Sequence, residues 1–259
     1  MAKVHQNFTI TQKCELSAGY CLLHLKPASG KLPEGILPGQ FVEILAPDNA
    51  TMLRRPISIH FVDYNTDRIS LLIRRVGNGT NAICDLPEGE ALDIVLPLGN
   101  GFSEDFEAGA TVILVGGGVG VAPLLYQASK LKDKGIRVKM VYGARTVDEL
   151  VVAEAFKPYC ELEITTDDAS AGTPGRVTDS VCFREYLKEA AMVQCCGPGP
   201  MMKAVAAACK AHGVACEVSL ENMMACGLGA CLCCVEKTVK GNVCVCTEGP
   251  VFNIEKLTW

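Results

Sequence analysis

Residues 110–215 alternate short apolar strands with helix-like segments, and this alternation constrains the fold more than any other feature of the sequence. "TVILV" and "RVKMVYG" read as buried strands, and the segments "LLYQASKLKDKG" and "TVDELVVAEAF" that follow them have the periodicity of helices. "ELEITTD", a helix near 179–190, "AMVQCCG", "PMMKAVAAACKAHG" and "VACEVSL" continue the series. Strands that alternate with helices in this way predict a doubly wound parallel sheet.

Local signals mark two helix ends in this region. Gly135 stands where a glycine commonly follows the last turn of a helix. Thr146 and Glu149 have the spacing of a capping box, in which each side chain bonds a backbone N–H of the first turn. We therefore expect one helix to end at Gly135 and another to begin at Thr146.

The first hundred residues have a different rhythm. Six short segments rich in β-branched residues are separated by Gly, Pro and Asn: "NFTITQ", "GYCLLHL", "QFVEIL", "RPISIHFV", "RISLLIRRV" and "EALDIVL". This pattern is typical of a small closed antiparallel β-barrel or a sandwich. A linker near residue 102 is expected, which gives a multi-domain α/β chain with limits at 1–102, 103–215 and 216–259.

Composition excludes several classes of protein. A net charge of −5 gives no electrostatic footprint for nucleic acid, and no apolar run approaches the ~18 residues of a membrane span. The opening "MAKVHQNFTI" lacks the apolar core of a signal peptide, so a cytoplasmic location is expected. Thiols stay reduced there, and an odd count of 15 cysteines also argues against a full set of disulfides.

Two glycine-rich turns follow predicted strands. "GGGVGVAP" contains Gly118, Gly120 and Pro123 between a strand and a helix, the context in which a backbone turn and a helix N-terminus hold a phosphate. "CCGPGP", which includes residues 196–198, repeats this arrangement at a later strand. An ordinary strand–helix turn is the alternative for each. Arg145 could hold a 2′-phosphate, or it could lie in solvent.

The barrel region carries two arginine motifs. "RRPISI" places a cation beside a hydroxyl on a strand, and "LLIRRVGNGT" ends a strand in Arg74 and continues into a turn with Gly79 and Thr80. Arginine and free N–H groups at a glycine turn suit a pyrophosphate. Taken singly, either motif could be a surface arginine or a plain hairpin.

Six cysteines lie within 21 positions near the C-terminus. Cys226, Cys231 and Cys234 have the x4 and x2 spacing of plant-type [2Fe–2S] proteins, and Cys244 or Cys246 could supply a fourth thiolate. A zinc site built from Cys231, Cys234, Cys244 and Cys246 is the main alternative, but it leaves Cys226 and the glycines of the loop unexplained. Buried or redox-sensing thiols are the third interpretation.

Together the three regions resemble the ferredoxin–NADP reductase superfamily, through "RPIS", "GGGVGVAP" and "CGPGP". "ENMMACGLGACLCCV" and "VCTEGPVF" more narrowly resemble the electron-transfer subunits of dihydroorotate dehydrogenase B. The resemblance implies an FAD-binding barrel, an NAD-binding sheet domain and a [2Fe–2S] domain.

The resemblance also implies a role for individual residues. The flavin and its phosphates would be held by Arg55, Pro56, Ile57, Ser58, Leu72, Ile73, Arg74, Gly79 and Thr80. The nicotinamide loops would contain Gly118, Gly120, Pro123, Cys196, Gly197 and Pro198. The cluster ligands would be Cys226, Cys231, Cys234 and Cys246.

The function implied is an electron relay in pyrimidine biosynthesis. A partner subunit carrying FMN would oxidise dihydroorotate, and electrons would pass singly through the [2Fe–2S] centre to FAD, which reduces diffusible NAD⁺. No acid–base catalytic residue is expected in this chain, and a heterotetramer with two copies of each subunit is implied. We expect the cluster segment to expose an apolar patch that docks the partner. The alternatives are the flavin subunit of another NAD(P)H-dependent complex, of the ferredoxin or sulfide reductase type, and a zinc-stabilised nucleotide-binding protein.

Overall fold

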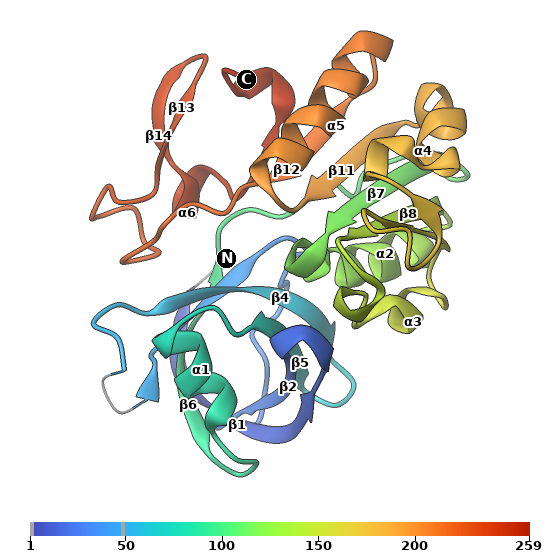
Figure 1. The fold of residues 1–259 in the computed structure, drawn as a ribbon. Helices are drawn as coiled ribbons and strands as arrows, with labels where there is room; N and C mark the ends of the chain where they lie inside the picture. The colour runs from blue at the N-terminus through green and yellow to red at the C-terminus, as the bar shows by residue number, and fades with distance from the viewer. Residues whose placement is uncertain (1–2, 48–49) are drawn as a thin grey trace.

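The computed structural model describes residues 3–47 and 50–259 and has three parts. Figure 1 shows a β-barrel, a sheet covered by helices, and a C-terminal hairpin segment, drawn in red, beside both. Within the described ranges, no helix is both long enough and apolar enough to cross a membrane.

The barrel is closed by six antiparallel strands in the order β1-β2-β5-β4-β3-β6. The strands are β1 (Val4–Glu15), β2 (Tyr20–Pro27), β3 (Phe41–Ile44), β4 (Arg55–Asp63), β5 (Arg68–Arg74) and β6 (Ala91–Leu98). Alternate residues such as Phe8, Ile10, Leu23 and Leu25 point inward and are fully buried, as the period-two pattern requires. The six predicted strands and the barrel interpretation are therefore confirmed.

One helix in the barrel was not anticipated from the sequence. The "VGNGT" stretch, predicted as a turn, leads into α1 (Asn78–Asp85), so Gly79 and Thr80 lie in a helical first turn. The glycines and asparagines of this stretch favour turns. The helix forms because Ile83 and Cys84 are buried against the barrel core.

The second part is a seven-stranded sheet in the order β10-β9-β8-β7-β11-β12-β15. Its strands are β7 (Thr111–Gly117), β8 (Arg137–Ala144), β9 (Glu161–Thr166), β10 (Thr173–Pro174), β11 (Met192–Cys196), β12 (Cys216–Ser219) and β15 (Val251–Asn253). All neighbours are parallel except β12 and β15, which pair antiparallel. The predicted doubly wound parallel sheet is confirmed.

Helices cover both faces of this sheet. They are α2 (Leu124–Asp133), α3 (Ala153–Phe156), α4 (Val181–Tyr186) and α5 (Gly199–His212), with single turns at η3 (Gly118–Val121), η4 (Val147–Glu149), η5 (Val177–Asp179) and η6 (Leu187–Glu189). Alternate residues of β7 point to opposite faces of the sheet. Val112 and Leu114 pack with α2 and α3 on one face, and Ile113 and Val115 pack with α4 and α5 on the other. Gly135 follows α2 with φ +74°, as expected for its position.

The predicted capping box at Thr146 is wrong. Thr146 precedes only the single turn η4, and its side chain makes no capping hydrogen bond. The Glu149 carboxylate instead accepts hydrogen bonds from Arg74 and Arg145. The Glu149 side chain therefore belongs to an ion-pair network that reaches the barrel, and it does not cap the helix start as the local pattern predicts.

The C-terminal segment leaves the sheet after β12 and returns to it as β15. In between lie the cysteine-rich loop, a hairpin of β13 (Val235–Thr238) and β14 (Gly241–Cys244), and α6 (Val245–Glu248). The single turns η1 (Ser17–Gly19) and η7 (Ile254–Lys256) complete the elements. The domain limits at 102 and 215 stay a prediction, but β12 and β15 lie beyond residue 215 and belong to the sheet.

Candidate functional site: two crevices and a cysteine loop

A first cavity of about 490 Å³, the barrel crevice, opens between the barrel and the edge of the sheet. Nearly all of the predicted flavin residues line it: Arg55, Pro56, Ile57, Ser58, Leu72, Ile73, Arg74 and Thr80. Most come from β4 and β5, neighbouring strands whose outward faces turn toward the sheet domain. The sequence motifs therefore meet in a single hollow, large enough for a cofactor ring.

The N-terminus of α1 lies at this crevice. Gly79 packs so closely on Arg55 that a Cβ atom would come within 2.8 Å of the Arg55 Cδ. A larger residue at position 79 would therefore displace the side chain of Arg55 from the first turn of α1. An arginine beside the free N–H groups of a helix start is a good receptor for a phosphate group.

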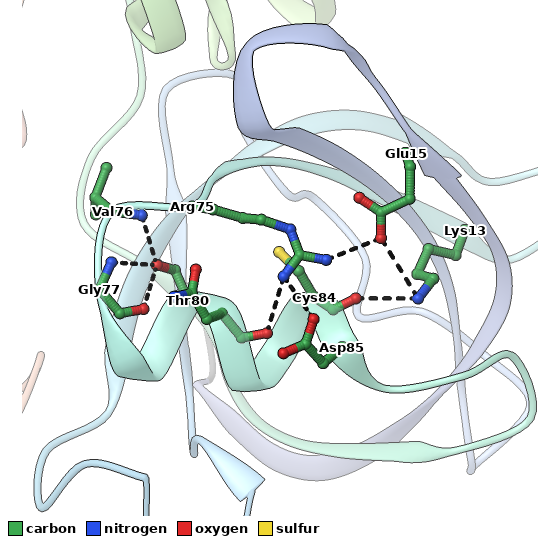
Figure 2. A network of polar contacts seen from close by, with 9 residues as sticks. Lys13, Glu15, Arg75, Val76, Gly77, Thr80, Cys84 and Asp85 are labelled. Atoms are coloured by element: carbon green, nitrogen blue, oxygen red, sulfur yellow. Dashed lines mark hydrogen bonds and ion pairs between the residues drawn. The ribbon is translucent and has the colours of Figure 1, made fainter.

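The Thr80 hydroxyl is already committed within this turn, as Figure 2 shows. It donates to the Gly77 carbonyl at 3.1 Å and accepts from the backbone N–H groups of Val76 and Gly77 at 3.0 and 3.2 Å. The hydroxyl proton is thus used, and a phosphate at this end would meet backbone N–H groups. Thr80 shapes the turn that presents them.

Arg75 anchors the same turn to the barrel on the side away from the crevice. Its guanidinium donates to Glu15 at 2.9 Å and to Asp85 at 2.7 Å, so it joins β1 to the end of α1 (Figure 2). Each of these ion pairs is partly exposed and contributes modestly to stability. Together they fix the direction of the helix.

A second cavity of about 460 Å³, the sheet crevice, follows the carboxyl ends of the parallel strands. Gly118, Gly120, Gly197 and Pro198 line it, as predicted. The crevice also contains Val119, Gly143, Ala144, Thr165, Asp167, Arg176, Thr178 and Met201, which the sequence reasoning did not select. Gly143 and Ala144 end β8, and Thr165 and Asp167 lie at the end of β9; ligands bind at such strand ends in open α/β sheets. Strand position alone could have identified them.

The two glycine turns of the sheet crevice touch each other. A Cβ atom on Gly120 would lie 2.5 Å from the Cys196 carbonyl oxygen and 2.5 Å from the Gly197 Cα. Cys196 itself is buried, and Pro123 is the N-cap residue of α2. Neither of these two predicted residues lines the crevice, so their contribution is to the shape of the turns.

Arg145 does not stand free at the rim of the sheet crevice. Its Nε donates to Glu149 Oε1 at 3.2 Å, and its Nη2 bonds the same oxygen. Arg74 of the barrel reaches that oxygen from the other side, at 3.3 Å. These hydrogen bonds, chiefly those from Arg145, lower the pKa of the buried Glu149 carboxyl.

The two crevices share a wall. Arg74, Val119 and Glu221 line both. Glu221 follows β12 at its carboxyl end, and burial among protein atoms raises the pKa of its carboxyl, although the side chain is open to the crevices. A ligand in one crevice would therefore approach a ligand in the other at this point.

The cysteine loop begins where the barrel crevice ends. Asn222, Met223 and Met224 line that crevice, and the first cysteine of the loop is Cys226. Gly227 and Gly229 have φ of +64° and +83°, a left-handed backbone that glycine adopts without strain. The chain can therefore turn tightly around its own sulfur atoms.

The four predicted ligands are arranged as two pairs of thiols. Cys226 contacts Cys231, and Cys234 contacts Cys246 and also Cys244, which lies outside the predicted set. Backbone N–H groups point at the sulfurs: Leu228 donates to Cys226 Sγ and Cys246 donates to Cys234 Sγ, each at 3.4 Å. Burial raises the pKa of Cys226, but hydrogen bonds from such N–H groups outweigh burial and lower this pKa to about 6. Two thiolate pairs with N–H donors around them fit a two-iron centre, which takes two thiolates on each iron.

The identity of the fourth ligand stays a prediction. Both Cys244 and Cys246 lie against Cys234, and burial raises the pKa of each. Cys246 in addition receives a hydrogen bond from the Gly229 N–H, inside the glycine turn, which favours it. Within residues 3–47 and 50–259, no three His, Cys, Asp or Glu side chains are placed to hold a single metal ion.

A buried carboxyl lies between the loop and the barrel. Glu43 of β3 is fully buried, and a Cβ atom on Gly227 would meet its Cγ at 2.9 Å. Burial raises the pKa of Glu43 to about 7, against the opposing effect of Arg55 and Arg54. Sequence reasoning missed Glu43, because nothing local to β3 indicates that the cysteine loop packs on this residue.

Two family models match parts of the chain. A model of the iron-sulfur cluster binding domain of dihydroorotate dehydrogenase B matches residues 221–258. A model of an oxidoreductase NAD-binding domain matches residues 114–207. The first match covers the cysteine loop and the second covers the glycine turns of the sheet crevice.

Curated relatives match most of the chain. The dihydroorotate dehydrogenase B (NAD(+)) electron transfer subunit of Streptococcus pneumoniae (strain ATCC BAA-255 / R6) is 38% identical over 86% of this chain and 88% of its own length. The chain belongs to this family. Another member, from Streptococcus thermophilus, is 36% identical over 97% of this chain and 98% of its own. The predicted family and oxidoreductase class are thereby confirmed.

Solved structures support the fold. An NADH-dependent reduced ferredoxin-NADP oxidoreductase, described for flavin-based electron bifurcation, superposes with a TM-score of 0.86 at 30% identity and covers 97% of this chain and 90% of that one. A phthalate dioxygenase reductase superposes with a TM-score of 0.63 at 20% identity, over 80% of this chain and 64% of that chain. The second likeness concerns the fold alone.

Proposed function

We propose that this chain is the electron-transfer subunit of an NAD-dependent dihydroorotate dehydrogenase, which passes electrons from a partner subunit through a [2Fe–2S] centre and FAD to NAD⁺ in pyrimidine biosynthesis. The observation that carries the proposal is the continuous arrangement of three sites. The cysteine loop runs directly from the wall of the barrel crevice, and that crevice shares a second wall with the sheet crevice. Such an order suits a relay and has no use in a zinc-stabilised nucleotide sensor.

The barrel crevice is proposed to hold FAD. Arg55 and the first turn of α1 would bind the pyrophosphate, with Gly79 giving the close approach. Ile57, Leu72 and Ile73 offer an apolar wall for the flavin ring, and Ser58 a hydroxyl. The described residues thus supply both the charge and the apolar surface that the cofactor requires.

The sheet crevice is proposed to hold the dinucleotide. Gly118 and Gly120 form the turn after β7, and Gly197 and Pro198 form the turn after β11, so both turns present backbone to the pyrophosphate. The nicotinamide end would reach the wall shared with the flavin. Arg74 and Val119, which line both crevices, would then lie where the nicotinamide ring meets the flavin ring.

Cys226, Cys231, Cys234 and Cys246 are proposed to hold the [2Fe–2S] centre. When bound, the centre would supply one-electron chemistry and FAD would supply hydride-transfer chemistry. The chain's own residues hold these groups in order and direct N–H groups at the sulfurs, which tunes the reduction potential. No acid–base group of this chain is required.

An apolar rim is proposed to dock the partner, an FMN-containing catalytic subunit, in a heterotetramer with two copies of each chain. The rim consists of Leu53, Val76, Met223, Leu228 and Leu232. Met223 is 82% exposed and Leu232 is 65% exposed, and large apolar side chains left in water beside a redox loop favour an interface. A cytoplasmic location is proposed with it, since all 15 cysteines are free thiols.

A ferredoxin-type complex is the second candidate. It is favoured by the likeness to the ferredoxin-NADP oxidoreductase, which spans 97% of this chain. The two candidates differ in the electron donor. Reduction of NAD⁺ by dihydroorotate with the partner present, and its absence with reduced ferredoxin as donor, would favour the first.

Replacing one cluster ligand tests the relay. Cys231→Ser should remove most of about two irons and two sulfides per chain and the broad visible absorption of the centre, while FAD stays bound. Cys233→Ser is a matched control, because Cys233 is an exposed neighbour of the same loop outside the predicted ligand set.

Electron transfer then decides the function. With the partner subunit, Cys231→Ser should fail to pass electrons from dihydroorotate to NAD⁺, and Cys233→Ser should work normally. A Cys231→Ser protein that keeps the full rate would refute the relay. Iron loss in both variants would refute the ligand set.

A further inference from the structure

Glu43 is a buried acid whose carboxyl group has no hydrogen-bond partner. It lies on β3 of the barrel and is 0% exposed, and neither Oε1 nor Oε2 bonds a donor in the part of the chain that the structure describes. An ionised carboxylate in this state is strongly unfavourable, because nothing replaces the water that it loses on folding.

Two other buried acids of the chain show the usual solution. Glu217 on β12 accepts hydrogen bonds from the backbone N–H and the hydroxyl of Ser103 and from Nε2 of Gln194. Glu149 accepts hydrogen bonds from two arginines. Glu43 differs from both, so its carboxyl group needs a partner that the fold alone does not supply.

Two arginines at the start of β4 lie near Glu43 without bonding its carboxyl. Arg54 donates through Nη1 to the backbone carbonyl of Glu43 and forms an ion pair with Asp93 at 2.7 Å. Arg55 donates through Nε to the Arg54 carbonyl at 2.9 Å, and its side chain packs on Gly79 at the barrel crevice. Both guanidinium groups therefore have their contacts elsewhere.

The cysteine loop closes over the carboxyl group. A Cβ atom on Gly227 would lie 2.9 Å from Glu43 Cγ and 3.3 Å from Glu43 Oε1, so the loop packs directly on the acid. Gly227 follows Cys226, a predicted cluster ligand. Thiolates on iron carry negative charge, and a second buried negative charge beside them is repelled. These surroundings favour the neutral acid, which carries one O–H donor.

Hydrogen-bond donors already surround Cys226 within the loop. The Leu228 N–H donates to Cys226 Sγ at 3.4 Å, and the backbone N–H groups of Ala230 and Cys231 also bond this sulfur. Hydrogen bonds to the sulfurs set the reduction potential of an iron–sulfur centre, because they stabilise the more negative, reduced state. Glu43 approaches the same part of the loop from the barrel.

We infer that Glu43 is a positioning residue for the [2Fe–2S] centre, whose carboxyl O–H donates to the sulfur of Cys226 and raises the reduction potential of the centre. The inference rests on the proposed assignment of Cys226 as a ligand. The proton stays on Glu43 in both redox states. The barrel thus contributes to the potential of the centre through β3, as well as holding the flavin.

The midpoint potential of the centre tests the inference without turnover. The FAD-loaded protein is titrated with redox mediators, the reduced centre is followed by electron paramagnetic resonance, and FAD in the same sample is the internal control. Glu43→Met removes the O–H and keeps a side chain of similar length. The equilibrium constant for one-electron reduction of the centre should fall about tenfold, which is about 59 mV, while the FAD potential stays unchanged. Glu217→Gln, at a buried acid with its own partners, is the matched control and should move neither potential.

Glu43→Gln supplies the second arm, because glutamine keeps an N–H donor and carries no charge. Its reduction constant should stay within about twofold of the original. A rise of about tenfold would show that the original side chain is ionised and would overturn the inference, as would an unmoved constant in Glu43→Met. The glutamine arm stays decisive if Glu43→Met loses its irons. Failure of the original protein to bind iron would refute the ligand assignment, and the inference with it.

Discussion

His60 gives the fold a pH dependence that can be worked out from the structure. It lies on β4, is 2% exposed, and its Nδ1 is 2.8 Å from the Ala122 carbonyl oxygen at the start of α2. Because a carbonyl only accepts, Nδ1 carries the proton of a neutral ring. Burial lowers the pKa of His60 from 6.5 to about 4, although the bond to Ala122 opposes the shift.

The sign follows from linkage. The unfolded chain takes up a proton near pH 6.5, whereas the folded chain resists it down to about pH 4. The contribution of neutral His60 to the free energy of unfolding is therefore complete above pH 6.5, and it is lost progressively as the pH falls toward 4. The full shift is worth about 3 kcal/mol, of which about 1.4 kcal/mol is lost by pH 5.5.

The assay compares the melting temperatures of the original protein and His60→Gln between pH 8 and 5.5. Glutamine keeps an N–H donor near Ala122 but does not titrate. The Tm of the original protein relative to that of His60→Gln should fall by about 3–6 °C over this range, since 1 kcal/mol shifts the Tm of a chain of this size by about 2–4 °C. His24, whose pKa burial lowers, is present in both proteins and cancels. Parallel curves for the two proteins would refute the reasoning.

Three further predictions concern the crevices and the rim. Gly120→Ala would force apart the two glycine turns, so the hydride-transfer rate should fall about a hundredfold with FAD content unchanged; a normal rate in stopped-flow would contradict the contact. Thr80→Val removes three hydrogen bonds of the α1 turn and should cost about 1–3 kcal/mol, seen as a lower Tm and faster FAD release. Leu228→Ser with Leu232→Ser should weaken partner binding by about tenfold or more, whereas Val239→Ser, exposed on the hairpin turn, should not.

Local pattern was sufficient for the six barrel strands, because each of them carries its own periodicity. Phe8 and Ile10, or Leu23 and Leu25, alternate inward within a few residues, and burial follows directly. The same holds for the glycine turns, whose backbone requirements lie in the turns themselves. The meeting of Arg55 and Thr80 in one crevice came from the family resemblance.

Long-range contacts limited the rest. The capping box failed because Glu149 binds Arg74, 75 positions away, together with the nearby Arg145. β15 was assigned to the cysteine-rich tail because its three residues after a Gly-Pro pair are too few to show the periodicity of a strand. Glu43 was missed for the same reason, since its partner Gly227 lies on another part of the chain.

The return of β15 to the sheet has a mechanical consequence. Ser219 pairs with Val251, so the excursion that carries the six cysteines starts and finishes at adjacent points of one strand pair. Asn100 fastens it again through the carbonyls of Gly249 and Thr247. A redox group held in this excursion is anchored at both ends and cannot swing like a shuttle on a tether. Its spacing from the barrel is set by the scaffold, so transfer to the barrel crevice should be insensitive to solvent viscosity.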